Sequence, residues 1–179
     1  MMSRAAILPL VLAVAACTGT RTTGPGPACP ASTAPEGVVC AFYTRYLEMR
    51  PAGLPTAGQQ ASLEPWISGR LEARLDEARR VQGQFRDQNP SEKPPLVDGF
   101  LFASLFEGPT SFTVEAAATG DGITRVPVQF RYGTEATWQD VAVLVREGPG
   151  YVIDDIEFAG AGPFNPAGRL SDALDRAGE

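Results

Sequence analysis

The sequence contains no histidine, and this absence removes several kinds of active site at the outset. A Ser-His-Asp triad needs an imidazole as its general base, and zinc sites are built from histidines or from several cysteines. Only three cysteines occur in the 179 residues, so no metal and no cofactor is expected. Basic residues are also few, at 15 against 21 acidic residues, which leaves a net charge of −6. Because phosphate backbones are bound by clustered cations, no nucleic-acid partner is expected.

Apolar runs long enough to cross a membrane are missing too, and the run at the N-terminus is short. Residues 5–16 are apolar and uncharged and follow Arg4. This run is shorter than the roughly 20 residues of a membrane span and is typical of a signal peptide. It ends in Val14-Ala15-Ala16-Cys17, which resembles the lipobox of bacterial lipoproteins, where the cysteine is lipidated and becomes the first mature residue. We expect a signal peptide over residues 1–16 and lipidation of Cys17; the alternative is an ordinary signal peptide before a chance cysteine.

The residues after Cys17 predict a location and a tether. Thr18 stands where an aspartate would retain a Gram-negative lipoprotein in the inner membrane, so the resemblance implies the outer membrane, with the domain facing the periplasm. Residues 17–35 are rich in Gly, Pro and Thr and predict a flexible tether with a reach of roughly 20–25 Å. The membrane, contacted through the N-terminal lipid, is therefore the first expected partner.

Cys29 and Cys40 remain once Cys17 is assigned to lipid. An even pair of cysteines in an oxidising compartment favours a disulfide. A bridge over so short a loop would contribute on the order of 3 kcal/mol in the chain-entropy model and would pin the end of the tether to the domain. The alternative is two separate thiols, with Cys40 on a buried helix face.

Two amphipathic helices are predicted next. From Glu36 apolar residues recur at helical spacing until Pro51 ends the pattern. A second, longer helix is predicted from about Ser62, which suits an N-cap before Glu64-Pro65, to Asn89-Pro90. The stripes expected to face the core are Val39, Phe42, Tyr43, Tyr46 and Leu47 in the first helix, and Trp66, Ile67, Leu71, Leu75, Ala78, Val81 or Gln82, and Phe85 in the second.

Four strands in a meander are predicted to follow, over residues 111–119 and 124–132 and in a hairpin from Trp138 to Phe158 around Gly148-Pro149-Gly150. Pro127 favours an edge position or a bulge in the second of these strands. Two helices before four strands predict an α+β domain over residues 36–160, with the helices packed on one face of a curved antiparallel sheet. Residues 161–179 are expected to be a loosely ordered tail with a short helical turn from Leu170 to Arg176.

The segment from Leu96 to Phe106 is the most hydrophobic part of the mature chain. We interpret it as a buried turn with a short strand or helical turn. The functional alternative is a pocket wall or a partly exposed contact patch, with Phe100 as its candidate residue.

Asp154 and Asp155 are the adjacent carboxylates of the predicted hairpin. Side chains alternate along a strand, so the two should face opposite sides and cannot act on one substrate as a pair. Asp155, grouped by alternation with Tyr151, is the candidate to enter the concavity of the sheet, where an aspartate beside a phenol can act as a general base. The favoured interpretation is structural, with one aspartate facing water and the other binding backbone amides or an arginine. Without a histidine or a phosphate-binding glycine loop, the chain is not expected to be an enzyme.

Several short motifs resemble the YbjP-type family of uncharacterised bacterial lipoproteins. They are Gly26-Pro27-Ala28-Cys29, Ala41-Phe42-Tyr43, Asp98-Gly99-Phe100, Trp138-Gln139-Asp140 and Val152-Ile153-Asp154-Asp155-Ile156, so the resemblance covers about residues 30–159. It implies an NTF2-like fold, in which a bent sheet wraps a long helix around a potential pocket. It also singles out Trp138 and Asp140 as motif residues, and it supplies no catalytic residue.

Together these features predict an outer-membrane lipoprotein that serves as a non-enzymatic interaction or accessory module for an envelope protein assembly. It would dock through the face of the sheet or through the loops near residues 100–106. The alternative is a protein that binds a small molecule or lipid in an NTF2-like cavity.

Overall fold

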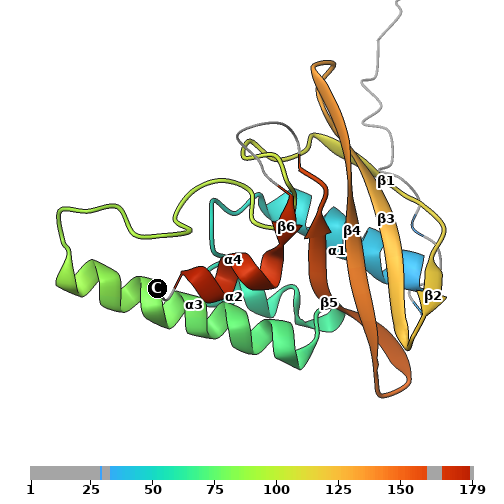
Figure 1. Cartoon of the computed structure of the whole chain (residues 1–179), viewed down its shortest axis with the longest axis horizontal. Coiled ribbons are helices and arrows are strands. Elements are labelled where there is room, and N and C mark those ends of the chain that lie inside the picture. Colours follow the sequence, from blue (N-terminus) through green and yellow to red (C-terminus); the bar gives the residue numbers. More distant parts are fainter. Residues whose placement is uncertain (1–28, 30–32, 161–166, 178–179) are drawn as a thin grey trace, which may run out of the picture.

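The computed structural model describes residues 29, 33–160 and 167–177. An antiparallel sheet forms one side of the molecule and helices lie against it on the other (Figure 1). The elements, in order, are α1 (Pro35–Met49), α2 (Ala57–Ala61), the 3-10 helix η1 (Glu64–Trp66), α3 (Gly69–Gln88), β1 (Ser111–Val114), β2 (Ala118–Gly120), β3 (Ile123–Tyr132), β4 (Ala136–Glu147), β5 (Gly150–Phe158), β6 (Gly168–Arg169) and α4 (Leu170–Arg176). The predicted α+β class with an antiparallel sheet is confirmed.

Over the described residues the sheet has six strands, in the order β1-β3-β4-β5-β6 with β2 also paired to β3, where four were predicted. The predicted strand over residues 111–119 is divided into β1 and β2, which pair with β3 on either side of Pro127. The carbonyl of Pro127 accepts a hydrogen bond from Glu115 N at 2.9 Å. Proline has no N–H to return that bond, so the regular ladder breaks there, as the sequence indicated.

The first helix is as predicted, but the second begins later than expected. Ser62 ends α2 instead of capping the long helix. The N-cap of α3 is Ser68, whose side chain accepts a hydrogen bond from Leu71 N at 3.0 Å. Ile67 before it is extended and forms a parallel bridge with Ile153 of β5. The helical period therefore cannot continue from Ser62 into α3.

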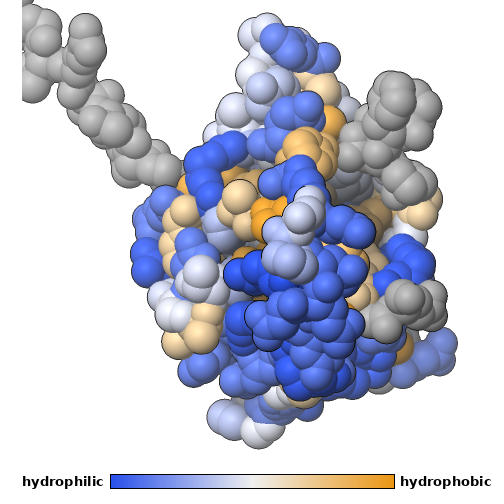
Figure 2. All heavy atoms as spheres, turned by 90° about the vertical axis from the view of Figure 1, so that its left-hand side faces the viewer, coloured by the Kyte–Doolittle hydropathy of each residue, from blue (hydrophilic) through white to orange (hydrophobic). Residues whose placement is uncertain are grey.

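α3 projects away from the sheet, and the surface seen from its free end is mostly hydrophilic (Figures 1 and 2). Its buried residues are Leu71, Leu75, Ala78 and Gln82, which lie on the predicted stripe. Within the part of the chain that the structure describes, no helix is both long enough and apolar enough to cross a membrane.

The core between α1 and the sheet is filled by aromatic side chains. Tyr43 of α1 packs edge-on against Phe130 of β3, with ring centroids 5.0 Å apart. Tyr46 packs in the same way against Phe102, at 4.9 Å. These four rings are essentially inaccessible to solvent. The space that a bent sheet could leave as a cavity is therefore occupied by the protein's own side chains.

Residues 168–177 were expected to belong to a loose tail, but in the structure they pack against the domain. β6 pairs with the end of β5, and α4 buries Leu170 and Leu174 in the main core. These two residues are four apart, so they lie on one face of the helix and point into the core together. Residues 161–166, which begin the predicted tail, lie outside the described residues.

A disulfide joins Cys29 to Cys40 of α1, with Cα atoms 5.4 Å apart. Cys29 is exposed, whereas Cys40 is buried in the core. The alternative of two separate thiols is not what the structure shows. The bridge ties a residue that precedes the domain to the second turn of its first helix.

Loss of this bridge is expected to lower the free energy of unfolding by about 3 kcal/mol, because the unfolded chain regains the freedom that the short loop removes. Urea denaturation of Cys29→Ser, Cys40→Ser and the double variant measures this. All three variants lack the bridge, so they should lose similar amounts. A much larger loss for Cys40→Ser alone would show that burial of Cys40, and not the bridge, provides the stability.

Candidate functional site: the groove between α3 and α4

A bulge in β5 places both hairpin aspartates inside the protein. Val143 of β4 pairs with Asp155 and the next residue, Leu144, pairs with Ile153, so Asp154 has no cross-strand partner. Asp154 and Asp155 are only 3% and 4% exposed. The expectation that one of them faces water is therefore wrong. Strict alternation fails because the bulge inserts one extra residue.

Asp154 binds the N-terminus of α3. Its Oδ1 accepts hydrogen bonds from Ser68 Oγ at 2.7 Å and from Arg70 Nε at 2.9 Å. Arg70 Nη2 also forms an ion pair with the other carboxylate oxygen. Because Ser68 is the N-cap residue, Asp154 fixes the point at which α3 leaves the sheet.

Asp155 binds the N-terminus of α4 in a similar way. It accepts hydrogen bonds from the backbone N and the Oγ of Ser171 at 3.0 and 2.7 Å and from Arg169 Nε at 2.9 Å. Its cross-strand partner is Val143, whereas the neighbours Ala142 and Leu144 belong to the core face. Asp155 therefore lies on the sheet face opposite the concavity that it was predicted to enter.

The predicted base-and-phenol pair is not assembled. The hydroxyl of Tyr151 accepts a hydrogen bond from Arg146 Nη2 at 3.0 Å, next to the turn of the hairpin. The Arg146 guanidinium also lies over the Tyr151 ring, 4.3 Å from its centroid. Tyr151 and Asp155 are thus engaged by different partners.

Asp140 is a third buried carboxylate and lies beside Trp138 on β4. It accepts hydrogen bonds from Trp138 Nε1 at 3.1 Å and Ala159 N at 3.1 Å. It also accepts bonds from the N and Oγ of Ser104, the former at 2.8 Å. Burial raises the pKa of the nearby Tyr43 hydroxyl, and the negative charge of Asp140 raises that pKa further. The Trp138-Asp140 motif therefore joins β4, the end of β5 and the loop around Ser104.

Phe100 belongs to the same loop and is nearly buried. Its ring packs edge-on against Tyr46 with centroids 4.6 Å apart. It also lines a small hollow of about 190 Å³ together with Phe106, which is 58% exposed. Gly108, at φ 73°, leaves the space that the Phe100 ring occupies, since a Cβ there would lie 2.3 Å from a ring atom.

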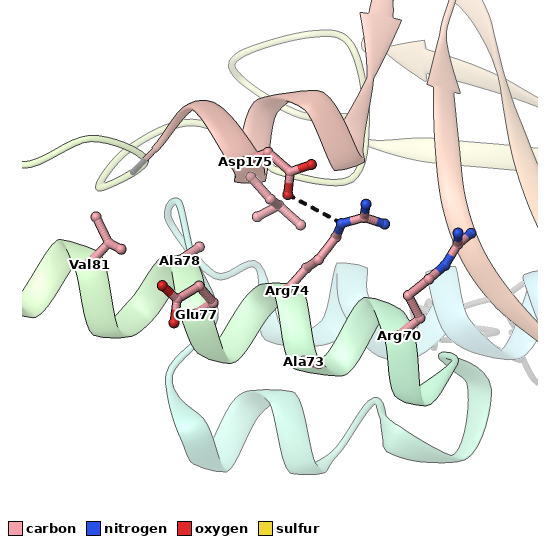
Figure 3. A pocket seen from close by; sticks show the side chains of 8 residues that line it. Arg70, Ala73, Arg74, Glu77, Ala78, Val81 and Asp175 are labelled. Atoms are coloured by element: carbon pink, nitrogen blue, oxygen red, sulfur yellow. Dashed lines mark hydrogen bonds and ion pairs between the residues drawn. The ribbon is translucent and has the colours of Figure 1, made fainter. Parts of the chain in front are cut away.

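A larger groove of about 450 Å³ lies between α3 and α4. Arg70 and Arg74 rise from α3 on the side that faces α4, and Asp175 reaches down from α4 to Arg74 (Figure 3). The rest of the lining consists of Glu77 and of small or apolar side chains, namely Ala73, Ala78, Val81 and Leu174. The walls of the groove are thus the two helices whose N-termini Asp154 and Asp155 hold.

The charged groups of the groove keep part of their hydrogen-bonding capacity. Arg74 uses only Nε, which donates to Asp175 at 3.2 Å, so neither of its Nη atoms has a partner among the described residues. Arg70 likewise keeps Nη1, since Asp154 takes Nε and Nη2. A hydrogen bond from Arg80 lowers the pKa of Glu77, which favours its charged form. The groove can therefore bind a group that offers both acceptors and donors.

Among the described residues, no three His, Cys, Asp or Glu side chains cluster so that they could hold a metal ion.

The groove was not visible in the sequence. The charged residues of α3 look like a solvated helix face, and α4 lies in a segment that begins with Gly and Pro. A helical turn from Leu170 to Arg176 is predicted, but not its docking on the domain; the signal for that was the spacing of Leu170 and Leu174, which indicates a buried helical face.

The lipid attachment predicted at Cys17 lies outside the described residues. No family model matches the chain. No solved structure matches it either. The chain is similar to the uncharacterised lipoprotein YbjP of Escherichia coli strain K12, with 27% identity over 182 residues that cover 94% of each chain. This similarity along almost the full length confirms the resemblance to YbjP-type lipoproteins seen in the short motifs.

Proposed function

We propose that this chain is a non-enzymatic interaction module, anchored by lipid to the outer membrane and facing the periplasm, where it serves an envelope protein assembly. One observation carries the non-enzymatic part of the proposal. The three buried acidic side chains of the described residues, Asp140, Asp154 and Asp155, each accept several hydrogen bonds that hold a loop or a helix in place. Carboxylates engaged in this way shape a surface and are not poised for proton transfer to a substrate.

The location is proposed from the N-terminus. The lipobox ending in Cys17 and the threonine at position 18 support an outer-membrane anchor, and the name of the similar protein YbjP describes a lipoprotein. An exposed domain on a tether can reach a partner within the envelope while it remains attached to the membrane.

We also propose that the fold is of the NTF2-like type. A meander with α1 packed on one face of the sheet supports this assignment. The alternative function, binding of a small molecule or lipid inside such a fold, is weaker because aromatic side chains occupy the core between α1 and the sheet.

The anchoring proposal predicts that Cys17→Ser moves the protein from the membrane fraction to the soluble periplasmic fraction. Cys29→Ser is the matched control, because it removes a cysteine without touching the predicted lipid attachment, and it should stay with the membrane. Thr18→Asp should shift the protein from outer-membrane to inner-membrane fractions on a sucrose gradient. Membrane retention of Cys17→Ser would show that the anchor lies elsewhere.

The interaction proposal is tested by cross-linking the lipidated protein in native envelopes, followed by affinity capture. We expect one stoichiometric membrane or envelope protein. Recovery of abundant porins alone, in the same amounts as from a mock capture, would contradict the proposal.

A further inference from the structure

We propose that the α3–α4 groove binds an extended peptide segment of the partner protein. In this arrangement a carboxylate of the peptide lies against Arg70 and Arg74, and a neighbouring apolar side chain lies over Val81 and Leu174. The inference rests on the proposed function as an interaction module and specifies the chemistry that the module recognises.

The two arginines provide the binding site for the carboxylate. They are four residues apart on α3, so their side chains lie one turn apart on the same face. Both extend along the groove (Figure 3), and the Arg70 side chain is 63% exposed. The Nη atoms that their internal ion pairs leave unused can donate to a carboxylate, for which guanidinium geometry is well suited.

The rest of the lining favours a peptide over a phosphate or a lipid headgroup. Glu77 and Asp175 stand in the same groove and would repel a doubly charged phosphate more strongly than a single carboxylate, and Glu77 can accept hydrogen bonds from peptide N–H groups. Ala73 and Ala78 leave room for a backbone to approach α3. The volume of about 450 Å³ lies within the roughly 300–1,000 Å³ of ligand sites.

Both walls of the groove are fixed before a ligand arrives. Asp154 holds the N-cap of α3 and Asp155 holds the first turn of α4, and the two are adjacent residues of one strand. Because both walls are already fixed to the sheet, the groove loses little conformational freedom when a ligand binds, and this favours affinity.

The test uses a library of random 12-residue peptides displayed on phage and selected against the full mature protein in detergent. We expect enriched peptides to share an Asp or a Glu next to a large apolar residue. A synthetic peptide from this set should bind the Arg74→Gln variant about tenfold more weakly, as for loss of a partly desolvated ion pair. Changing the peptide carboxylate to an amide should cause the same loss in the wild-type protein and little further loss in Arg74→Gln.

A matched control separates binding from groove shape. Asp175→Asn breaks the same internal ion pair as Arg74→Gln but keeps the cation. We expect Asp175→Asn to bind the peptide as well as the wild-type protein or more tightly. Equal weakening by both variants would overturn the inference, because it would show that the ion pair only maintains the groove.

Two further outcomes would overturn it. One is Arg74-dependent binding of phosphatidylglycerol vesicles or inorganic phosphate, with no acidic consensus among the selected peptides. The other is capture of the same stoichiometric envelope partner by wild-type and Arg74→Gln proteins, in which case the proposed function stands and the groove is not its binding site. If Arg74→Gln fails to capture that partner while Asp175→Asn still captures it, the result supports both the proposed function and the groove as its binding site.

Discussion

Asp140→Ala is expected to lower the free energy of unfolding by about 3 kcal/mol. The substitution leaves three N–H donors without an acceptor, two in the buried residues Ser104 and Trp138 and one in Ala159. It also removes the acceptor of the Ser104 hydroxyl. Stranded donors in a buried site cost more than the hydrogen bonds themselves contribute. Urea denaturation followed by tryptophan fluorescence and by far-UV circular dichroism measures the loss.

Gln139→Ala is the matched control for this prediction. It changes the adjacent residue of the same strand, whose side-chain amide donates a hydrogen bond to the exposed Glu115, so its effect should stay below about 0.5 kcal/mol. Asp140→Asn should also be destabilising, because either orientation of the amide places its nitrogen opposite at least one N–H donor. A neutral result for both Asp140 variants would contradict the role assigned to this carboxylate.

Asp155→Ala is expected to release α4 from the domain. The variant removes the acceptor for the backbone N and hydroxyl of Ser171 and for Arg169. Docking of Leu170 and Leu174 in the core then loses the hydrogen bonds that orient their helix. We expect a loss of about 3 kcal/mol and faster amide hydrogen exchange over residues 170–177.

The control for Asp155 is Asp172→Asn, an exposed position of the same helix, which should leave exchange almost unchanged. Because α4 forms one wall of the groove, Asp155→Ala should also abolish peptide binding, whereas Asp172→Asn should not. Rapid exchange throughout the domain, and not in α4 alone, would mean that Asp155 supports the whole fold.

Much of the fold follows from sequence periodicity. The helical stripe on α1 and the first strand of the predicted hairpin, β4, are found in the structure, because both elements bury one regular face. The irregularity at Pro127 was also predictable, since the missing N–H is a property of the residue itself.

The site was less predictable, for physical reasons that concern single residues. No glycine or proline marks the bulge at Asp154, so the sequence offers no sign that Ile153 and Ile156 share the core. The bond between Asp155 and Ser171 joins residues 16 positions apart and depends on how α4 docks. Which helices the two aspartates hold, and the groove that results, could be seen only in the three-dimensional arrangement.

The bridge between Cys29 and Cys40 also determines how mechanical force enters this domain. Tension applied through residues before Cys29 passes across the disulfide to Cys40, which is the sixth residue of α1. The covalent segment between the two cysteines, which includes the start of the helix, carries none of that load. The force therefore acts on a buried position of α1, beside Val39 and Phe42, and not on the end of a helix that could fray.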